Sequence, residues 1–177
     1  DNTDKIFSMT PKDLNMVSNI KDMIEVGVNS FKVEGRMRSI YYIATVINTY
    51  RRAIDDYYNS RLSKEKIEYY LMILGRVANR DSCPQFFNRF PDTNEQYFLG
   101  REEVSNQDYL GIVNSYDGEY VTLTQKNYFK TGDIVEFIGP NMEEYTYTIS
   151  TIIDEDENEI DVARHPKMIV KLPLDKR

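Results

Sequence analysis

The sequence predicts an α+β protein in two parts, a piece of an α/β fold followed by a small antiparallel β-barrel. Apolar residues recur every three to four positions through much of residues 1–80, as they do in amphipathic helices. From Asp108 onward they alternate with polar residues, as in strands that are buried on one face. Residues 81–99 are rich in turn formers and phenylalanines, and they are expected to form a packed linker. The predicted parts are therefore residues 1–80, the linker 81–99 and residues 100–177.

A first helix is predicted from the segment Thr10-Pro11-Lys12-Asp13. Threonine is a good N-cap, proline fits the first helical position, and aspartate suits the positive end of a helix. Gly27 is placed to end the helix as a C-cap. A break near Asn19 would give two short helices instead, and the sequence leaves both readings open. The apolar residues at helical spacing are Leu14, Val17, Ile20 and Ile24.

Residues 30–34, Ser-Phe-Lys-Val-Glu, alternate in polarity and predict a strand, with a turn at Gly35-Arg36. Ser39 is placed to cap a long helix that runs to about Asn59, and another helix is expected from about Ser63 to Gly75. The expected apolar face of the long helix consists of Ile40, Ile43, Ala44, Ile47, Ile54 and Tyr58.

The order helix, strand, helix is a piece of an α/β fold, but one strand cannot form a sheet by itself. Either the partner strands precede residue 1, or this region packs on the second half of the chain. The chain starts without an initiator methionine in a polar stretch, which favours a fragment. A processed or tagged start would look the same. The sequence therefore indicates the edge of a larger sheet.

The second half predicts several short strands joined by turns. Asp117-Gly118 is a strong hairpin signal between two of them. Strands this short and evenly spaced are typical of a closed or nearly closed antiparallel barrel. The strand candidates are Tyr109–Asn114, Tyr120–Thr124, Asp133–Phe137, Tyr145–Ile153, Ile160–Ala163 and Met168–Leu172.

Charge and composition limit the function. Residues 1–99 carry a net charge of +1 and residues 100–177 carry −8, which together make the −7 of the whole chain. An acidic second half binds phosphate backbones poorly, so any nucleic-acid contact is expected in the first half. One cysteine, Cys83, and one histidine, His165, cannot form a disulfide or a four-ligand metal site within this chain. The expectation is a cytoplasmic protein without a membrane span.

Residues 27–39, Gly-Val-Asn-Ser-Phe-Lys-Val-Glu-Gly-Arg-Met-Arg-Ser, resemble a motif of peptidase family U32. This family includes collagenase-like proteases and tRNA hydroxylation proteins. Tyr50-Arg51 and Ala53-Ile54-Asp55 continue the resemblance in the helix that follows. The segment Phe129-Lys130-Thr131-Gly132-Asp133 is similar to the family's C-terminal barrel domain. The linker departs from the family pattern, because it is expanded between Cys83 and Gln96.

The resemblance implies that residues 1–80 are the end of a TIM-like catalytic domain whose signature cysteines lie upstream of Asp1. Some relatives hold an iron–sulfur cluster on such cysteines, so no cofactor is expected in this chain. The implied function is hydroxylation of the wobble uridine of tRNA, or proteolysis of collagen-like substrates. The expected partners are the upstream domain, tRNA or a protein substrate, and further subunits of the same or another kind. Alternatively, the barrel is a non-catalytic binding module.

Glu34 and Arg36 are the candidate catalytic residues. They lie where the predicted strand ends, and α/β barrels place their chemistry at the carboxyl ends of strands. A carboxylate there can act as a base, and an arginine can hold a carboxylate or phosphate at two points. A strand-end ion pair or a capping contact would explain the same residues. The candidate substrate-binding residues are Lys32, Arg38, Tyr42 and Arg51, which could equally belong to a solvated or packed surface.

Overall fold

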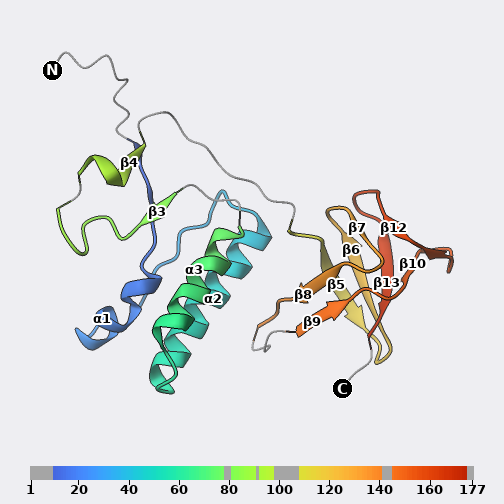
Figure 1. The fold of residues 1–177 in the computed structure, drawn as a ribbon, viewed down its shortest axis with the longest axis horizontal. Coiled ribbons are helices and arrows are strands. Elements are labelled where there is room, and N and C mark those ends of the chain that lie inside the picture. Colours follow the sequence, from blue (N-terminus) through green and yellow to red (C-terminus); the bar gives the residue numbers. More distant parts are fainter. Residues whose placement is uncertain (1–9, 78–80, 91, 98–107, 141–144, 175–177) are drawn as a thin grey trace, which may run out of the picture. The chain divides into compact units, whose positions relative to one another are not determined.

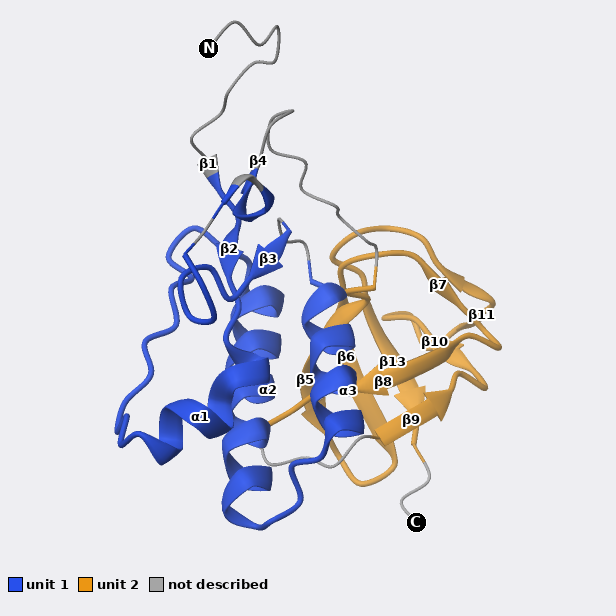
Figure 2. Ribbon diagram, turned by 60° about the vertical axis from the view of Figure 1, so that its left-hand side comes forward, with its two compact units in different colours: residues 1–106 blue, residues 107–177 orange. Residues whose placement is uncertain are grey.

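The computed structural model describes residues 10–77, 81–90, 92–97, 108–140 and 145–174. The chain divides into two compact units, residues 1–106 and residues 107–177, which are coloured separately in Figure 2. The described helices longer than one turn lie in unit 1, and unit 2 is built from strands (Figure 1). The predicted mixture of helix and sheet is therefore confirmed. No described helix has the length and apolar character needed to cross a bilayer.

Short strands, and not a helix, open the described chain. β1 (Thr10–Pro11) pairs with β4 (Gln96–Tyr97), which follows the single turn η2 (Thr93–Glu95). β2 (Asp13–Leu14) pairs in parallel with β3 (Ser82–Cys83). The prediction of a helix start at Thr10 is wrong, because the backbone here forms hydrogen bonds to the linker and not to the next turn of its own chain.

The helix after these strands is short and broken. A 3₁₀ turn, η1 (Val17–Asn19), leads directly into α1 (Ile20–Glu25), so the alternative with a break near Asn19 is the correct one. Gly27 ends α1 as predicted, with a positive φ of 91°. Its N–H donates to the carbonyl of Ile24, and the N–H of Val28 donates to that of Met23, both at 3.0 Å. This pair of bonds is a Schellman motif, which favours glycine at the left-handed position.

Two longer helices form a hairpin next to α1 (Figure 1). α2 (Ile40–Tyr58) begins at Ser39, whose Oγ accepts from the N–H of Tyr42 at 3.1 Å. α3 (Lys64–Gly75) begins at Ser63, whose Oγ accepts from the N–H of Lys66 at 3.3 Å. Both predicted helices are confirmed, and so is the predicted cap at Ser39; the cap at Ser63 lies where the second helix was expected to start.

The buried side of α2 is not the predicted one. The helix buries Thr45, Val46, Thr49, Ala53 and Asp56. Four residues of the expected face are exposed instead: Ile40 (71%), Ile43 (40%), Ile47 (48%) and Tyr58 (70%). Ala44 is exposed as well, and Ile54 is half-buried. The reason is that η1, α1 and α3 pack on the opposite side of α2, around a core of Val17, Ile20, Val46, Ala53, Tyr70 and Leu74.

Residues 30–34 do not form the predicted strand. The described part of the chain gives them no β-ladder, and Figure 1 shows a drawn-out stretch between α1 and α2. The alternation that predicted a strand is nevertheless kept. Phe31 and Val33 are half-buried against the helical core, whereas Lys32 and Glu34 are exposed. The segment therefore has the two faces of a strand, but no described strand pairs with it.

Unit 2 contains a five-stranded sheet in the order β11-β10-β13-β6-β5 and two separate strand pairs. The sheet consists of β5 (Gly111–Tyr116), β6 (Tyr120–Gln125), β10 (Ile152–Ile153), β11 (Glu159–Ile160) and β13 (Ile169–Pro173). The pairs are β7 (Phe129–Lys130) with β12 (Val162–Ala163), and β8 (Ile134–Phe137) with β9 (Tyr145–Thr148). The hairpin at Asp117-Gly118 is confirmed, with the Asp117 carboxylate accepting from the N–H groups of Glu119 and Tyr120 at 2.9 and 2.7 Å.

The described strands of unit 2 do not close into a barrel, which corrects the prediction. Two predicted strands are each broken in two, at residues 149–151 and at Asp161. At the first break, Ile149 is buried in the core, and its N–H and C=O bond to Asp133 and Gly132. The chain thus changes sheet at these points. The core between the sheets consists of Val121, Leu123, Phe129, Ile149, Ile152, Ala163, Val170 and Leu172.

Candidate functional site

The charged motif residues before α2 lie on an open surface. Glu34 accepts a hydrogen bond from the N–H of Arg36 through Oε1 at 3.1 Å, which fixes the turn that follows it. Lys32 Nζ lies 4.0 Å from the second oxygen of the same carboxylate, and the two side chains are 87% and 71% exposed. The structure therefore brings Lys32, Glu34 and the Arg36 backbone together. Water remains free to reach them, so their catalytic roles stay predictions.

Gly35 lets this segment approach α2 closely. A Cβ atom on Gly35 would lie 3.0 Å from Cγ1 of Ile43, which is tighter than ordinary van der Waals contact. The N–H of Arg38 then donates to the carbonyl of Gly35 at 2.9 Å and turns the chain toward Ser39. Glu34 and Arg36 are thereby held just before the N-terminus of α2.

Arg38 and Tyr42, two predicted substrate-binding residues, meet each other and Asp13. Nη2 of Arg38 lies 3.1 Å from Oδ2 of Asp13, and both side chains are about one-fifth exposed. The guanidinium also lies 5.0 Å from the centre of the Tyr42 ring, a cation–π distance. This contact ties the start of α2 to β2. It gives Arg38 and Tyr42 a positioning role, whatever else they bind.

A second polar tie joins α2 to the same part of the chain. The hydroxyl of Tyr50 accepts from the N–H of Met16 at 2.8 Å and lies 3.3 Å from Oδ1 of Asn15. Burial raises the pKa of the Tyr50 phenol above its ordinary value, so the group stays a neutral donor and acceptor. This tie was not predicted, because nothing in the local sequence places Tyr50 near residues that precede it by more than thirty positions.

Arg51 lies on the exposed side of α2 and pairs within its own helix. Its guanidinium forms a two-point ion pair with Asp55, with Nε to Oδ2 at 3.1 Å and Nη2 to Oδ1 at 2.6 Å. The hydrogen bond to Asp55 raises the pKa of Arg51 further above its already high value. The pair has the spacing of successive helical turns, and such exposed pairs add only about 0.3–0.5 kcal/mol to stability.

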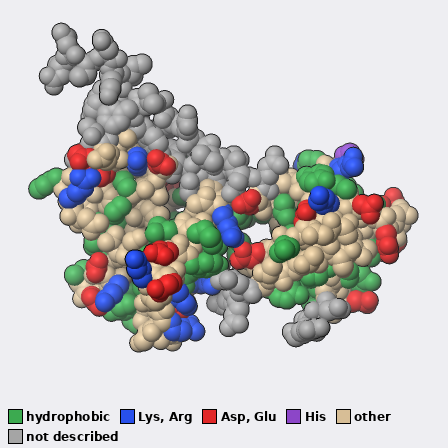
Figure 3. Space-filling view, viewed as in Figure 1, with side chains coloured by type: hydrophobic (Ala, Val, Ile, Leu, Met, Phe, Trp, Pro, Cys, Tyr) green, Lys and Arg blue, Asp and Glu red, His purple; other side chains and the backbone are tan. Residues whose placement is uncertain are grey.

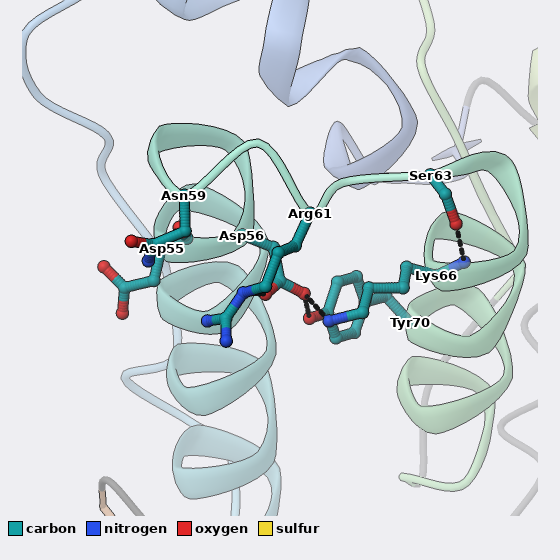
Figure 4. A network of polar contacts seen from close by, with 7 residues as sticks. All are labelled: Asp55, Asp56, Asn59, Arg61, Ser63, Lys66 and Tyr70. Atoms are coloured by element: carbon teal, nitrogen blue, oxygen red, sulfur yellow. Dashed lines mark hydrogen bonds and ion pairs between the residues drawn. The ribbon is translucent and has the colours of Figure 1, made fainter.

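Asp56 is the centre of an unpredicted polar cluster that joins α2 to α3 (Figure 4). The side chain is only 6% exposed, and its Oδ2 accepts from Lys66 Nζ at 2.5 Å and from the Tyr70 hydroxyl at 2.6 Å. Arg61 Nε approaches the other oxygen, Oδ1, at 3.1 Å. Lys66 and Tyr70 are four residues apart on α3, so they share a face. The sequence signal for this cluster is a lysine and a tyrosine four residues apart on α3, together with an aspartate outside the expected apolar face of α2.

Electrostatics keep the Asp56 carboxylate ionised although it is buried. Burial opposes ionisation, but the hydrogen bonds from Lys66 and Tyr70 outweigh it and hold the pKa of Asp56 below its ordinary value. Burial and the hydrogen bond to Asp56 raise the pKa of Tyr70, which therefore remains a proton donor. The cluster acts as a structural clamp, because Lys66 and Tyr70 of α3 both bond to the buried carboxylate of α2.

Nothing in the described residues fits a metal centre. No group of three histidine, cysteine or acidic side chains is placed to hold an ion there. Cys83 is half-buried in β3, and it is the one cysteine of the chain. An iron–sulfur cluster needs several thiolates, so these residues do not fit one. No chemical step is assigned to a metal in this chain.

Two family models match the chain. Residues 1–97 match the model described as Peptidase family U32, and residues 105–177 match the model described as Peptidase family U32 C-terminal domain. The first match includes the charged segment before α2, and the second includes the strands of unit 2.

Individual relatives carry different names. A protein of Bacillus subtilis (strain 168) named "tRNA hydroxylation protein P1" is 47% identical over 180 residues, which cover 98% of this chain and 42% of that protein. A "Collagenase" of Porphyromonas gingivalis is 28% identical over 158 residues, which cover 82% of this chain and 43% of the other. The chain therefore spans less than half the length of these relatives.

A solved structure is also similar to part of the chain. It is the C-terminal domain of a Geobacillus thermoleovorans protein assigned to the U32 peptidases, and it is 41% identical. The similarity covers 42% of this chain and 88% of that domain, with a TM-score of 0.38.

Proposed function

Since this chain belongs to peptidase family U32, we propose that it is the C-terminal portion of a protein that hydroxylates the wobble uridine of tRNA. The relative named for tRNA hydroxylation supports this choice, because it is 47% identical over nearly the whole chain. The relative named collagenase is 28% identical over a shorter part. The chain alone is expected to be inactive, since its described residues hold no complete catalytic arrangement.

The observation that carries the proposal is the open position of the charged motif before α2. Lys32 and Glu34 point their charged groups into solvent, and Arg36 follows in the turn that Glu34 organises. In the proposal, Glu34 acts as a base or orients the substrate, and Arg36 binds a phosphate or carboxylate at two points. Arg38 and Tyr42 hold this segment in place through Asp13. In the proposal, Lys32 and Arg51 exchange their carboxylate partners, Glu34 and Asp55, for phosphates of an RNA substrate.

The proposed partner within the same protein is an upstream catalytic domain of TIM-like fold. That domain would carry any iron–sulfur cluster, since the residues of this chain do not fit one. The proposed site of tRNA contact is unit 1, because residues 100–177 carry a charge of −8 and repel a phosphate backbone. Such a protein is expected to work in the cytoplasm, where tRNA is found.

The test replaces Glu34→Gln and Arg36→Ala separately in the whole protein. Removal of a general base or of a charged substrate contact is expected to lower tRNA hydroxylation by about 100-fold or more. The measurement is mass spectrometry of nucleosides from tRNA of cells that express each variant. Matched controls are Glu68→Gln on α3 and Arg164→Ala in unit 2, both at exposed positions. Unchanged hydroxylation in a folded Glu34→Gln protein would remove Glu34 from the site.

The alternative is a protease that acts on collagen-like substrates, as the name of the Porphyromonas relative says of that protein. The same variants distinguish the two functions. Degradation of denatured collagen by the purified whole protein, lost in Glu34→Gln while tRNA hydroxylation persists, would favour the protease. If both activities persist in both variants, the remaining reading is that this chain is a non-catalytic module for a substrate or partner.

A further inference from the structure

Three phenylalanines lie exposed in the loop that follows β3. Phe86 is 71% exposed, Phe87 is 44% exposed and Phe90 is 94% exposed, so the expectation of a packed linker is wrong for this part. Residues 84–90 are here called the phenylalanine loop. Figure 1 shows the loop reaching outward from β3, away from the α2–α3 pair, and Figure 3 shows hydrophobic side chains at the same edge of unit 1. Exposed apolar surface of this kind usually marks an interaction site.

Hydrogen bonds hold the backbone of the phenylalanine loop in one shape. The N–H of Phe87 donates to the carbonyl of Pro84 at 3.1 Å, which closes a turn. Gln85 lies in the left-handed region with a φ of 45°, and its Nε2 donates to the carbonyl of Lys12 at 2.6 Å. A residue with a Cβ keeps this φ only where its surroundings hold it there. The rings are therefore presented by an ordered backbone, which lowers the entropic cost of binding.

The charged side chains next to the loop pair with one another, and the rings are left open. Arg89 binds Asp92 through Nη1 at 2.6 Å and Glu95 through Nη2 at 2.8 Å. Lys12 Nζ lies 3.4 Å from Oδ2 of Asp81 at the base of the loop. Among the described residues, none of the three phenylalanine rings contacts another aromatic ring. Side chains that dominate protein interfaces cluster together, whereas separate ring faces suit stacking on flat groups.

The phenylalanine loop and the charged motif before α2 are anchored at the same residue, Asp13. The N–H of Asp13 donates to the carbonyl of Asp81 at 2.9 Å, immediately before β3. The Asp13 carboxylate pairs with Arg38 at 3.1 Å, immediately before α2. Both segments therefore belong to unit 1, the unit in which tRNA contact is proposed, and β2 connects them.

We propose that Phe86 and Phe90 stack on unpaired bases of the tRNA anticodon loop while the charged motif holds the wobble uridine. This inference rests on the proposed function for the identity of the substrate. An enzyme that modifies a base takes it out of its stack, so the neighbouring bases need other stacking partners. Aromatic side chains supply them in proteins that bind single-stranded RNA, and each stacked base contributes about 5- to 150-fold in affinity.

Binding of an anticodon stem-loop RNA to the whole protein tests the stacking. Phe86→Leu combined with Phe90→Leu keeps apolar side chains but removes the ring faces, so it should weaken binding by about 10-fold or more. The slope of log K against log salt should stay unchanged, since phenylalanine displaces no counterions. Phe86→Tyr combined with Phe90→Tyr should retain the natural affinity. The matched control is Tyr128→Leu in unit 2, a 53% exposed aromatic outside the loop, which should have no effect.

A fluorescent purine placed next to the wobble position reports the contact itself. Stacking quenches such a base, so the bound RNA should fluoresce more strongly on the double leucine variant than on the natural protein. The same RNA annealed to a complementary strand has no unpaired base at this position. The natural protein and the double leucine variant should therefore bind that duplex equally.

Two results would overturn the proposal. Unchanged binding of the stem-loop by the double leucine variant would exclude stacking, and an oligomer of the natural protein that this variant dissociates in sedimentation would then identify a second copy as the partner. An equal loss of affinity for the stem-loop and the duplex would show that the two rings support the fold. The hydroxylation assay of Glu34→Gln is separate from these binding measurements, so stacking can fail while the catalytic assignment is confirmed, and the reverse.

Discussion

At the scale of single residues, Asp56 and its neighbour Asp55 occupy opposite environments. The Asp56 side chain is 6% exposed and bonded to α3, whereas the Asp55 side chain is 51% exposed and paired with Arg51 of its own helix. A buried carboxylate with three donors stabilises the fold only while all its partners remain. The identity of the residue matters less here than the side of α2 on which it lies.

Asp56→Asn is expected to destabilise unit 1 by about 2–3 kcal/mol, because Lys66 and Tyr70 lose their ionised partner. Asp55→Asn, the control one residue earlier, should cost no more than about 0.5 kcal/mol. Hydrogen exchange of the α2 and α3 amides measures both. Equal effects of the two variants would contradict the clamp.

The Asp56 carboxylate should also make the stability of unit 1 depend on pH. The pKa of Asp56 is lower in the folded protein than its ordinary value of about 4, which the unfolded chain retains. Its stabilising contribution is therefore complete above about pH 4 and is lost as the pH falls through the lower, folded-state pKa. The protection of α2 and α3 should fall in that acidic range for the natural protein. Asp56→Asn should remove this part of the pH dependence. If the protection of the natural protein and of the variant falls in parallel, another group causes the pH dependence.

At the scale of elements, α2 and α3 were predicted well, but the start of the first helix and the environment of α2 were not. Ser39 and Ser63 cap α2 and α3 because a cap is a contact between residues two or three apart. The buried side of α2 depends on α1 and α3, and the local pattern pointed to the opposite side. Short strands near Thr10 replaced a good helix start because residues 81–97 supply hydrogen-bond partners from far along the chain.

Gly27 is an element-scale case that can be measured. Its φ of 91° is unfavourable for residues with a Cβ, so Gly27→Ala should destabilise the end of α1 by about 1–2 kcal/mol. Gly75→Ala is the control, since α3 includes Gly75 and a Cβ there would meet nothing within 4 Å. That change should be neutral or stabilise by up to about 1 kcal/mol. The measurement is thermal unfolding of each variant, monitored by hydrogen exchange of the amides in α1 and α3.

At the scale of the whole molecule, charge separates the two units. Residues 1–106 of unit 1 carry no net charge, whereas residues 107–177 of unit 2 carry the whole −7 of the chain. Figure 3 shows acidic side chains gathered at one end of unit 2. Lys171 of β13 pairs with Glu157, in a turn that Asp154 stabilises by accepting from two backbone N–H groups. Unit 2 is thus more suited to a protein partner or to solubility than to RNA.

Binding of tRNA by the whole protein should therefore depend on unit 1. Lys32→Gln combined with Arg36→Gln is expected to lower the slope of log K against log salt by about 1–2, one phosphate contact per residue. Lys126→Gln with Lys130→Gln in unit 2 should leave the slope unchanged. Filter binding over a range of salt concentrations measures both. An equal decrease of this slope in the two double variants would show that the RNA contact is not specific to unit 1.

The sequence by itself determined the family, through its motif residues, and the helices, strand tendencies and caps that depend on near neighbours. The candidate residues Lys32 and Glu34 were also foreseen on one face, since alternation survives even without a sheet. Only the tertiary structure decided which side of α2 is buried, that Arg38 pairs with Asp13, and that Asp56 joins α2 to α3. The physical reason is range: these contacts join residues far apart in the chain, and short-range periodicity carries no information about which distant element will meet a given face.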